Sequence, residues 1–443
     1  MVTNYSRLAK VEIAADGEGL VSRSGTALIA EFADRLGLTS ALSGALADTR
    51  ERAGGHDPGR VLADLALTLC DGGDCLADLG ALRDQADLFG RVASGATAWR
   101  AIERATGRLD DLRSARAQAR AVAWARGGAP EQLVLDFDSH LVSSHSDKQG
   151  ATPTWKRGFG FHPLLCYLDG SGEPLAGVLR EGRAGANTAA DHVEVLSLAL
   201  AQIPAEHLDR PMLARSDSAG ATHDFAAALR ETGVRFSLGY GLTEATREAI
   251  LALSERDWAP AIDQDGEPRE GAWVAELTAA VELSEWPEGT RLICRRERPH
   301  PGAQLSFTDH EGHRFQCLLT DQAGDDLAAL EVRHRAHARV EDSIRCAREC
   351  GLANLPFREF APNAVWLELV LTAQDLLAHA SSLCLEGGLA RAEPKRLRQR
   401  VLHVAGRLTR SGRRLTLHLP RRWPWAAALL AAFGRLRSLP LRA

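Results

Sequence analysis

The chain has 443 residues, of which 45% are hydrophobic and 25% charged, and its formal net charge is −5. A chain of this length exceeds one ordinary hydrophobic core and should form two or three domains, and its composition is that of a soluble globular protein rather than a disordered or membrane-embedded one. The acidic balance excludes a uniformly basic nucleic-acid-binding protein.

Residues 1–130 are predicted to be mainly helical. Apolar residues recur at a spacing near 3.6 in four segments: Thr26–Leu36, Pro58–Leu69, Cys75–Leu82 and Ala98–Arg126. The last segment would form one basic helix that either faces a phosphate backbone or is simply a solvated face. Its arginines are Arg100, Arg104, Arg108, Arg113, Arg116 and Arg120.

From residue 131 the pattern changes to strand, strand, strand, helix, strand. The first strand, Leu133–Asp138, alternates with period 2, so Asp136 and Asp138 share one face. The second aspartate of interest, Asp217, closes a short apolar run before small, turn-forming residues, at the strand edge where ligands bind in α/β sheets. The other elements are the strands Phe161–Asp169, Leu175–Arg180 and Met212–Asp217 and the helix Asp191–Gln202.

The loop between the first two strands, residues 143–160, mixes cations with aromatic side chains. Such a mixture suits contact with a phosphate backbone and stacking on an unpaired base, or else an ordinary surface loop with a tryptophan tucked beneath it. The residues are Lys148, Trp155, Lys156, Arg157 and Phe159. Arg180 and Arg183, beside the turns at Gly182 and Gly185, form a second candidate grip on phosphates.

After a helix at Asp224–Glu231 and a strand at Arg235–Gly239, residues 242–315 interrupt this α/β pattern. The segment is mostly β, with strands predicted at Ala272–Val281, Thr290–Arg296 and Gln304–Thr308 and turns at Asp265-Gly266 and Glu311-Gly312.

A third carboxylate, Glu341, lies in residues 331–348, which contain no Gly or Pro and are predicted to be helical. On a regular helix the spacing places one polar, mostly basic stripe along a single face: His334, His337, Glu341, Arg345 and Arg348. The apolar helix expected at Pro356–Ala380 is most simply core.

Asp138, Asp217 and Glu341 together suit a site for two divalent metal ions. Cleavage of a phosphodiester by two metal ions requires hard oxygen ligands, with one carboxylate bridging the ions and others holding each alone. Lone acids at the ends of elements are more often caps or solvated charges, so their spacing does not decide the question.

The C-terminal region is strongly basic, with 14 Lys and Arg residues but one acid, Glu393, from Arg391 onward. This asymmetry is typical of localised phosphate contact, or of an arginine-rich surface. The apolar run Trp423–Phe433 contains Pro424 and is too short to span a bilayer, so no membrane association is expected. Eight scattered cysteines, without a C-x-x-C pair or a secretory h-region, predict free thiols in a reducing cytoplasm.

Three segments resemble the catalytic blocks of DDE transposases from bacterial insertion sequences, most closely the family numbered 1380: LDFDSH (residues 135–140), ARSDSAG (214–220) and HRAHARVEDSIRCARECGLANLPF (334–357). Further segments resemble this family outside the blocks: GFGFHPLL (158–165), LREGRAGAN (179–187) and PKRLR (394–398). The resemblance extends over essentially the whole chain.

The resemblance implies that Asp138, followed by a small residue, is the first catalytic acid, with Asp136 as the fallback, and that Asp217 and Glu341 are the second and third. His337 departs from the Arg that the wider group often has there, which puts a phosphate contact at this position in doubt. The DNA-binding residues expected are Lys156, Arg157, Arg180, Arg183, His334, His337, Arg345 and Arg348.

The fold expected is α/β: an RNase H-like (retroviral-integrase-like) core interrupted by a mostly β insertion, with a helical N-terminal domain and a basic C-terminal region. The boundaries expected are 1–130 for DNA-end binding or dimerisation, 131–241 and 316–385 for the core, 242–315 for the insertion and 386–443 for the basic region. The resemblance implies cut-and-paste transposition with two Mg²⁺ ions, for which Mn²⁺ can substitute. It also implies double-stranded DNA as partner, a homodimer, and a cytoplasmic, nucleoid-associated location. A catalytically inactive DNA-binding relic and a metal-dependent nuclease without strand transfer are the alternatives.

Overall fold

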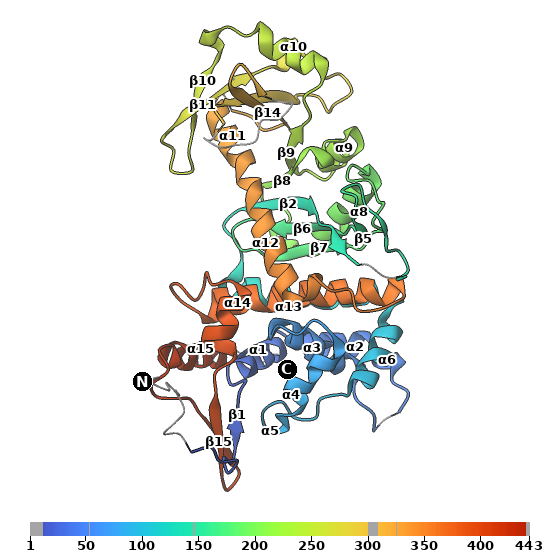
Figure 1. The fold of residues 1–443 in the computed structure, drawn as a ribbon, viewed down its shortest axis with the longest axis vertical. Coiled ribbons are helices and arrows are strands. Elements are labelled where there is room, and N and C mark those ends of the chain that lie inside the picture. The colour runs from blue at the N-terminus through green and yellow to red at the C-terminus, as the bar shows by residue number, and fades with distance from the viewer. Residues whose placement is uncertain (1–11, 53, 145–146, 300–308, 325, 440–443) are drawn as a thin grey trace, which may run out of the picture.

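A mixed ten-stranded sheet is the centre of the computed structural model, which describes residues 12–52, 54–144, 147–299, 309–324 and 326–439. The protein is elongated, with residues 244–297 at one end, residues 133–178 at its waist, and both terminal regions at the other end (Figure 1). The fold is therefore mixed α/β, as the sequence predicts.

Five strands form one half of the sheet, from the edge strand β7 inward, in the order β7-β6-β2-β8-β9. They are β2 (Leu133–Ser139), β6 (Leu164–Leu168), β7 (Pro174–Val178), β8 (Met212–Ser216) and β9 (Arg235–Tyr240). The pairs β2–β6 and β6–β7 are antiparallel, whereas β2–β8 and β8–β9 are parallel. Both faces of these strands are covered, which explains why β6 and β8 are buried along their whole length.

Helices cover the two faces of this sheet. The Phe137 ring of β2 packs edge-on against Phe225 of α9 (His223–Glu231), beside α8 (Ala189–Leu200). The preceding residue, Asp136, contacts His337 from the other face. Because adjacent strand residues point to opposite faces, α9 and the helix that carries Glu341 lie on opposite sides of β2.

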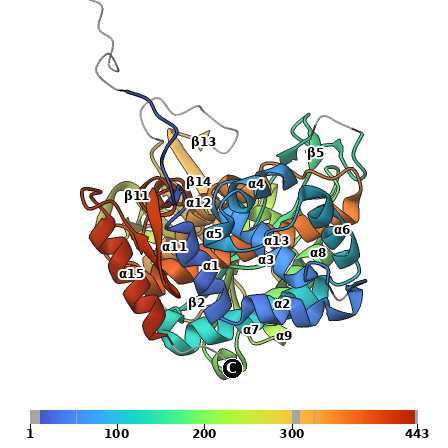
Figure 2. The same cartoon turned by 90° about the horizontal axis from the view of Figure 1, so that it is seen from below.

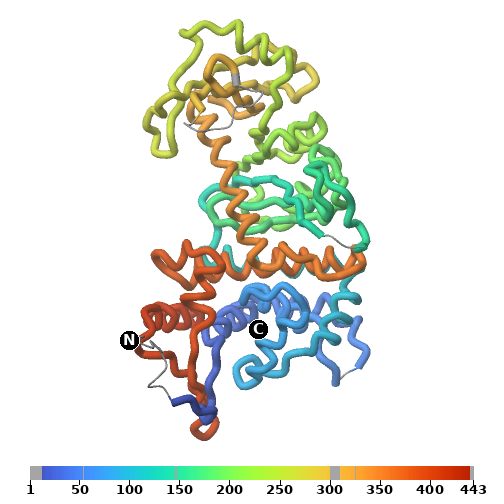
Figure 3. The backbone as a smooth tube through the Cα atoms, viewed as in Figure 1, coloured from blue at the N-terminus to red at the C-terminus, as the bar shows by residue number. Residues whose placement is uncertain are grey.

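The segment that follows β9 extends the same sheet. Beyond β9 follow β14 (His313–Thr320), β12 (Arg291–Glu297), β11 (Pro268–Glu276) and β10 (Ala259–Ile262), all antiparallel to their neighbours. The short β13 (Asp309–His310) pairs with β14, and α10 (Glu244–Ala252) caps this end of the molecule (Figure 3). The strand expected at Gln304–Thr308 lies outside the described residues.

One long helical rod links this end to the middle of the protein (Figure 1). It consists of α11 (Leu327–Arg335), a 3₁₀ turn η8 (Ala336–Arg339) and α12 (Val340–Ala347), and it ends in a kink where Gly351 adopts φ +101°. The following α13 (Phe360–Cys384) is buried on nearly every side, which confirms the apolar helix expected there.

The N-terminal region is a bundle of helices beneath α13 (Figures 1 and 2). Asp57 caps α3 by accepting a hydrogen bond from the Arg60 amide, with Pro58 at the first helical position. The single helix expected at Ala98–Arg126 is wrong, because the chain breaks around Gly107 into two helices. The helices are α1 (Thr26–Arg35), α2 (Leu38–Ala45), α3 (Pro58–Cys70), α4 (Gly80–Arg83), α5 (Ala86–Phe89), α6 (Gly95–Ala105) and α7 (Leu109–Ala123).

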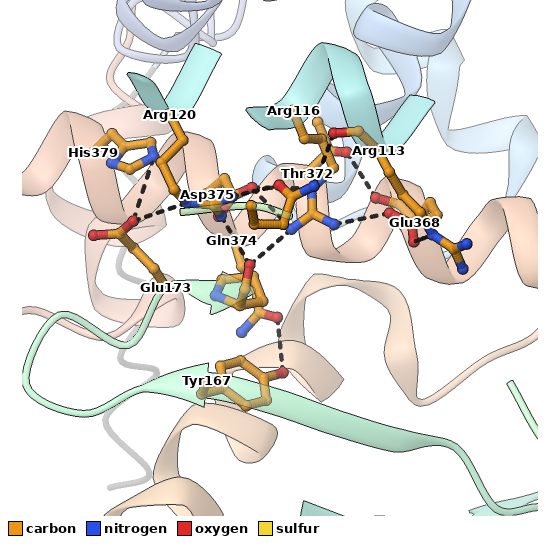
Figure 4. A network of polar contacts seen from close by, with 12 residues as sticks. Arg113, Arg116, Arg120, Tyr167, Glu173, Glu368, Thr372, Gln374, Asp375 and His379 are labelled. Atoms are coloured by element: carbon orange, nitrogen blue, oxygen red, sulfur yellow. Dashed lines mark hydrogen bonds and ion pairs between the residues drawn. The ribbon is translucent and has the colours of Figure 1, made fainter. Parts of the chain in front are cut away.

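Both interpretations of the arginines at residues 100–120 fail for α7. Arg116 and Arg120 are 2% and 0% exposed, and they pair with Glu368, Asp375 and Glu173 of the core (Figure 4). They face neither a phosphate backbone nor solvent. The positive charge of α7 instead attaches the N-terminal bundle to α13 and to the turn before β7.

The C-terminal region is packed against the rest of the protein. It comprises α14 (Pro394–Leu397), the hairpin β15 (Gly406–Ser411) and β16 (Arg414–His418), and α15 (Ala426–Ser438). The short β1 (Leu20–Val21) pairs with β15, and α15 packs on α13 and α1 through buried Leu429, Ala432 and Leu436. Within the described ranges, no helix is long and apolar enough to cross a membrane.

Candidate active site

Asp138 and Asp217 lie at the carboxyl ends of neighbouring parallel strands. The register pairs Phe137 of β2 with Ser216 of β8, so the next residue on each strand is one of these aspartates. Asp138 is half-buried and Asp217 is exposed. Gly239 on the adjacent strand makes room for the turn, because a Cβ there would lie 2.8 Å from the Ser218 nitrogen.

Glu341 approaches the same place from α12. This helix contacts β2, and Glu341 is exposed on it. Burial raises the pKa of Asp138 to about 6; the charge of His337 opposes this shift, and the charges of Asp217 and Glu341 add to it. Three carboxylates from two strands and a helix therefore act on one another electrostatically.

The three carboxylates retain free oxygens. Asp138 accepts a hydrogen bond from its neighbour's amide, Ser139 N, at 2.7 Å, and Asp217 accepts one from Ala219 N at 2.9 Å as the cap of a short turn. Neither they nor Glu341 has a cationic side chain within ion-pair distance among the residues that the structure describes. Hard anionic oxygens of this kind are the donors that Mg²⁺ and Mn²⁺ prefer.

A compact group of potential metal ligands lies elsewhere in the described residues. Within the described part of the chain, one group of three potential ligands, Asp74, Cys75 and Asp78, has all its donor atoms within 4.8 Å of one another. That group is a helix cap, since Asp78 accepts from the amides of Asp74 and Cys75. Asp138, Asp217 and Glu341 do not form such a group, so their ligand atoms do not all lie within that distance of one another.

Asp136 has a different environment from Asp138. Both of its oxygens accept hydrogen bonds from Arg215, each at 2.7 Å, and its Oδ1 also lies 3.0 Å from His337 Nδ1. Asp136 and Arg215 are each 1% exposed. The two aspartates lie two residues apart on one face of β2. Asp136 is neutralised and enclosed, whereas Asp138 remains available.

Residues 4–441 match the protein family described as Transposase DDE domain group 1. The chain belongs to this family. Among solved structures, it is similar to the piggyBac transposase in a synaptic complex with hairpin DNA, at 10% identity and a TM-score of 0.45, over 86% of this chain and 81% of that one. That likeness is too remote to carry an argument. No curated protein matches the sequence.

The basic stripe expected along the helix that carries Glu341 is dispersed. The 3₁₀ turn η8 has about three residues per turn instead of 3.6, so residues before it are rotated relative to Glu341. His334 Nδ1 contacts the Ser237 hydroxyl at 3.0 Å, and burial lowers the pKa of His334 to about 3, which leaves it uncharged at neutral pH. Arg345 pairs with Glu393 and Asp342, whereas Arg348 is exposed.

The loop at residues 143–160 contains a small sheet of β3 (Val142–Ser143), β4 (Thr152–Pro153) and β5 (Phe159–Phe161), so the strand expected at Phe161–Asp169 is split at Pro163. Trp155 is 66% exposed at the tip, with Lys156 Nζ 4.8 Å from its ring centre, which excludes a tryptophan tucked under the loop. Arg157 beside it is also exposed. The charges of Arg348 and Lys156 both act on His140, two residues beyond Asp138, so these cations lie on the side of the candidate site.

The two arginines of the second candidate grip have different surroundings. Arg180 is 6% exposed and donates to the carbonyls of His162 and Gly185 and to the Asp191 carboxylate. Its guanidinium therefore braces the polar loop from inside. Arg183 is exposed, and its Nε donates to Glu181 Oε2 on the same loop at 2.7 Å, which is a solvent-exposed ion pair.

Two residues that were not predicted from the sequence, Arg215 and His162, lie beside the aspartates and hold their neighbours in place. Arg215 precedes Asp217 by two positions, as Asp136 precedes Asp138, and this shared period was the available signal. His162 Nδ1 lies 3.0 Å from the Ala184 carbonyl, which can only accept, so His162 Nε2 accepts from the Ser139 hydroxyl at 2.9 Å. No local pattern in the sequence indicates that contact.

Asp138→Asn is expected to stabilise the metal-free protein at pH 7.5 by about 1–2 kcal/mol. The folded pKa of about 6 exceeds the ordinary value of 3.8, so the stability that Asp138 contributes is greatest below pH 3.8 and is lost as pH rises through 6. Full conversion of the shift would give about 3 kcal/mol, which solvent screening at this half-buried side chain reduces. Asn does not ionise, so it avoids the free-energy cost of a carboxylate charge at this position.

Urea unfolding at pH 7.5 and pH 4.5 measures the difference, which should shrink at the lower pH. Asp209→Asn, at an exposed aspartate before β8, is the control and should change stability little at either pH. Equal stability of Asp138→Asn and the parent at pH 7.5 would contradict the raised pKa of Asp138.

Proposed function

We propose that this family member is an active cut-and-paste DNA transposase whose Asp138, Asp217 and Glu341 hold two Mg²⁺ ions. The observation that carries the proposal is the contrast between these three carboxylates, which have no cationic partner among the described residues, and the neighbouring Asp136, which Arg215 neutralises. Unpaired acids gathered at a strand edge repel one another, and a bound cation relieves that repulsion.

The strand order supports an RNase H-like core. Three antiparallel strands, β2, β6 and β7, are followed by two that add parallel to the other side of β2, and the acids stand at the carboxyl ends of β2 and β8. This arrangement brings the first two acids together, and α12 adds the third across them.

In this proposal the bound ions would activate a water or a 3′-hydroxyl and stabilise the leaving oxygen in an in-line displacement. The protein's own residues place the ions and the DNA. The turn cap holds Asp217, and His162 holds Ser139 beside Asp138. We assign phosphate contact first to the exposed cations near the site: Lys156, Arg157, Arg183 and Arg348. Trp155 is available for base stacking.

The hairpin β15–β16 is the second surface that we assign to DNA. Its register places Arg407, Thr409 and Ser411 opposite His418, Thr416 and Arg414, so one face of the hairpin carries only polar or basic side chains. The exposed arginines of this region have no acid partner among the described residues: Arg407, Arg410, Arg413, Arg414, Arg421 and Arg422. We assign double-stranded DNA as the partner of this surface. We also propose that the enzyme is a homodimer that holds two element ends.

Arg407→Gln/Arg414→Gln is expected to weaken binding to any double-stranded DNA and to lower the slope of log K against log salt concentration by about 1–2, since fewer counterions would be released. Fluorescence anisotropy at several salt concentrations measures the slope. Substitutions are preferable to truncation after residue 390, because α15 and Arg398 are packed into the core.

The matched control is Arg83→Gln/Arg437→Gln, which removes two charges that already face Asp84 and Glu31. If both double variants change the slope equally, the hairpin has no special role and the effect is one of net charge.

Nicking and joining assays test the proposed function itself. The DNA that flanks the reading frame should contain short inverted repeats, and fragments bearing them are the substrates. Mg²⁺-dependent nicking followed by joining of the 3′ end to target DNA supports the transposase. Nicking without joining would instead indicate a nuclease, and binding without nicking an inactive relic.

A further inference from the structure

Beneath the candidate metal ligands lies a group of charged side chains, with Asp136 and Arg215 buried at its centre, that the proposed chemistry does not use. Arg215 donates to both oxygens of Asp136 at 2.7 Å, and its Nη2 also lies 2.8 Å from Asp169 Oδ2. Arg339 in turn bonds Asp169 at 3.1 Å. Two acids and two arginines are thus paired in a chain that carries no net charge.

The sheet register explains why this pairing lies directly below the site. Asp136 and Arg215 are opposite each other on the parallel strands β2 and β8, two residues before Asp138 and Asp217. Side chains two residues apart on a strand share a face. The face therefore has a neutral layer, Asp136 with Arg215, and above it an anionic layer, Asp138 with Asp217.

His337 connects the two layers. Its Nδ1 lies 3.0 Å from Asp136 Oδ1, and its charge also acts on Asp138. The His337 side chain is only 12% exposed, and it lies in the 3₁₀ turn that immediately precedes α12 and Glu341. A contact of this kind restricts both the position of the ring and its rotation.

The contact also determines which ring nitrogen carries a hydrogen. Asp136 is held as a carboxylate by the two bonds from Arg215, and a carboxylate can only accept. His337 Nδ1 must therefore donate, which leaves Nε2 as the nitrogen available to other groups. A carboxylate that fixes the tautomer of a functional histidine is a recurrent arrangement at metal and hydrolytic sites.

We propose that Asp136, clamped by Arg215, is a positioning residue that holds His337 with its Nε2 directed toward the reacting oxygens between Asp138, Asp217 and Glu341. This inference rests on the proposed transposase function and adds a fourth side chain to its site.

A double-mutant cycle separates this role from a merely structural one. Asp136→Asn preserves the side-chain shape and is expected to lower the rate of metal-dependent nicking about 10–100-fold, the range for residues that orient a site's ligands. In a His337→Ala background the same substitution should change the rate less than about 3-fold, because the residue through which Asp136 acts is gone. Equal losses in both backgrounds would overturn the proposal.

The matched control is Asp375→Asn, which removes another buried carboxylate from an arginine pair, between α13 and α7. It should lower stability without interacting with His337→Ala in the cycle. If Asp136→Asn does not fold, Arg215→Lys serves in its place, since it keeps the charge but loses the two-point grip on Asp136, and the same outcomes apply.

A readout independent of activity is the ¹⁵N spectrum of labelled histidine, with the His337 signals assigned from their absence in His337→Ala. The parent should show a hydrogen bound at Nδ1, and Asp136→Asn should show a mixture of tautomers, whereas Asp375→Asn should leave the signals unchanged. An unchanged His337 signal in Asp136→Asn overturns the proposal. Absence of nicking by the parent protein with an intact tautomer effect would instead count against the proposed function alone.

Discussion

Asp217→Asn is expected to lower Mg²⁺-dependent nicking and joining at element ends by about 10³-fold or more while leaving DNA binding within about 3-fold of the parent. Substitution of residues that merely orient metal ligands typically lowers metal affinity or activity about 10–100-fold, and removal of a charged ligand should lower activity further. Asn can still accept the Ala219 amide bond that Asp217 accepts, so the turn after β8 is preserved. The exposed position of Asp217 makes a folding defect a poor explanation for lost activity.

The comparison of Asp138→Asn with Asp136→Asn gives this experiment its control. Both aspartates lie on one face of β2, but Asp138 faces the other two acids and Asp136 faces Arg215. We expect Asp138→Asn to be as inactive as Asp217→Asn, and Asp136→Asn to retain measurable nicking. Cleavage at the parental rate by purified Asp217→Asn would contradict the assignment of the active site.

Arg120→Met is expected to destabilise the protein by about 3–5 kcal/mol. The Arg120 guanidinium is fully buried and bonds Glu173, Asp375, Gln202 and the Pro174 carbonyl. Methionine fills much of the same volume, but it leaves two carboxylates buried with less positive charge, which costs more than the ion pair itself contributes. The midpoint of urea unfolding should fall accordingly.

The control for this substitution is Arg104→Met on α6. Arg104 pairs with Glu51, whose side chain is 69% exposed, and exposed pairs contribute about 1 kcal/mol or less. A loss below about 1 kcal/mol for Arg120→Met would mean that the buried network does not hold the N-terminal bundle to α13. Such a result would also restore the hypothesis that the arginines of α7 face a phosphate backbone or solvent.

Several elements could be predicted because their signals are local. The alternation in residues 133–138 indicated β2 and placed both aspartates on one face, and the small residues after Asp217 indicated the end of β8. The uninterrupted helix formers of residues 331–348 indicated the rod that carries Glu341, and the apolar run indicated α13. In each case the side-chain period or a turn residue acts within about ten positions, which a sequence displays directly.

The surroundings of the candidate site residues, in contrast, depend on partners that are distant in the chain. Alternation shows that Asp136 and Asp138 share a face, but the difference between them comes from Arg215, 79 residues later, which neutralises one and not the other. The stripe on the rod assumed 3.6 residues per turn throughout, and the 3₁₀ turn at Ala336–Arg339 rotated its first half. The burial of His334 against Ser237 followed from that rotation and from the position of β9.

The charge pattern of the sequence by itself determined that cations would be concentrated in α7 and after residue 390. Only the tertiary structure decided what those cations meet. In α7 they face buried acids of α13, and in the hairpin β15–β16 they face solvent. The physical reason is that a charge has a fixed position in the sequence, whereas its desolvation and its counter-charge come from whichever segments the long-range packing brings against it.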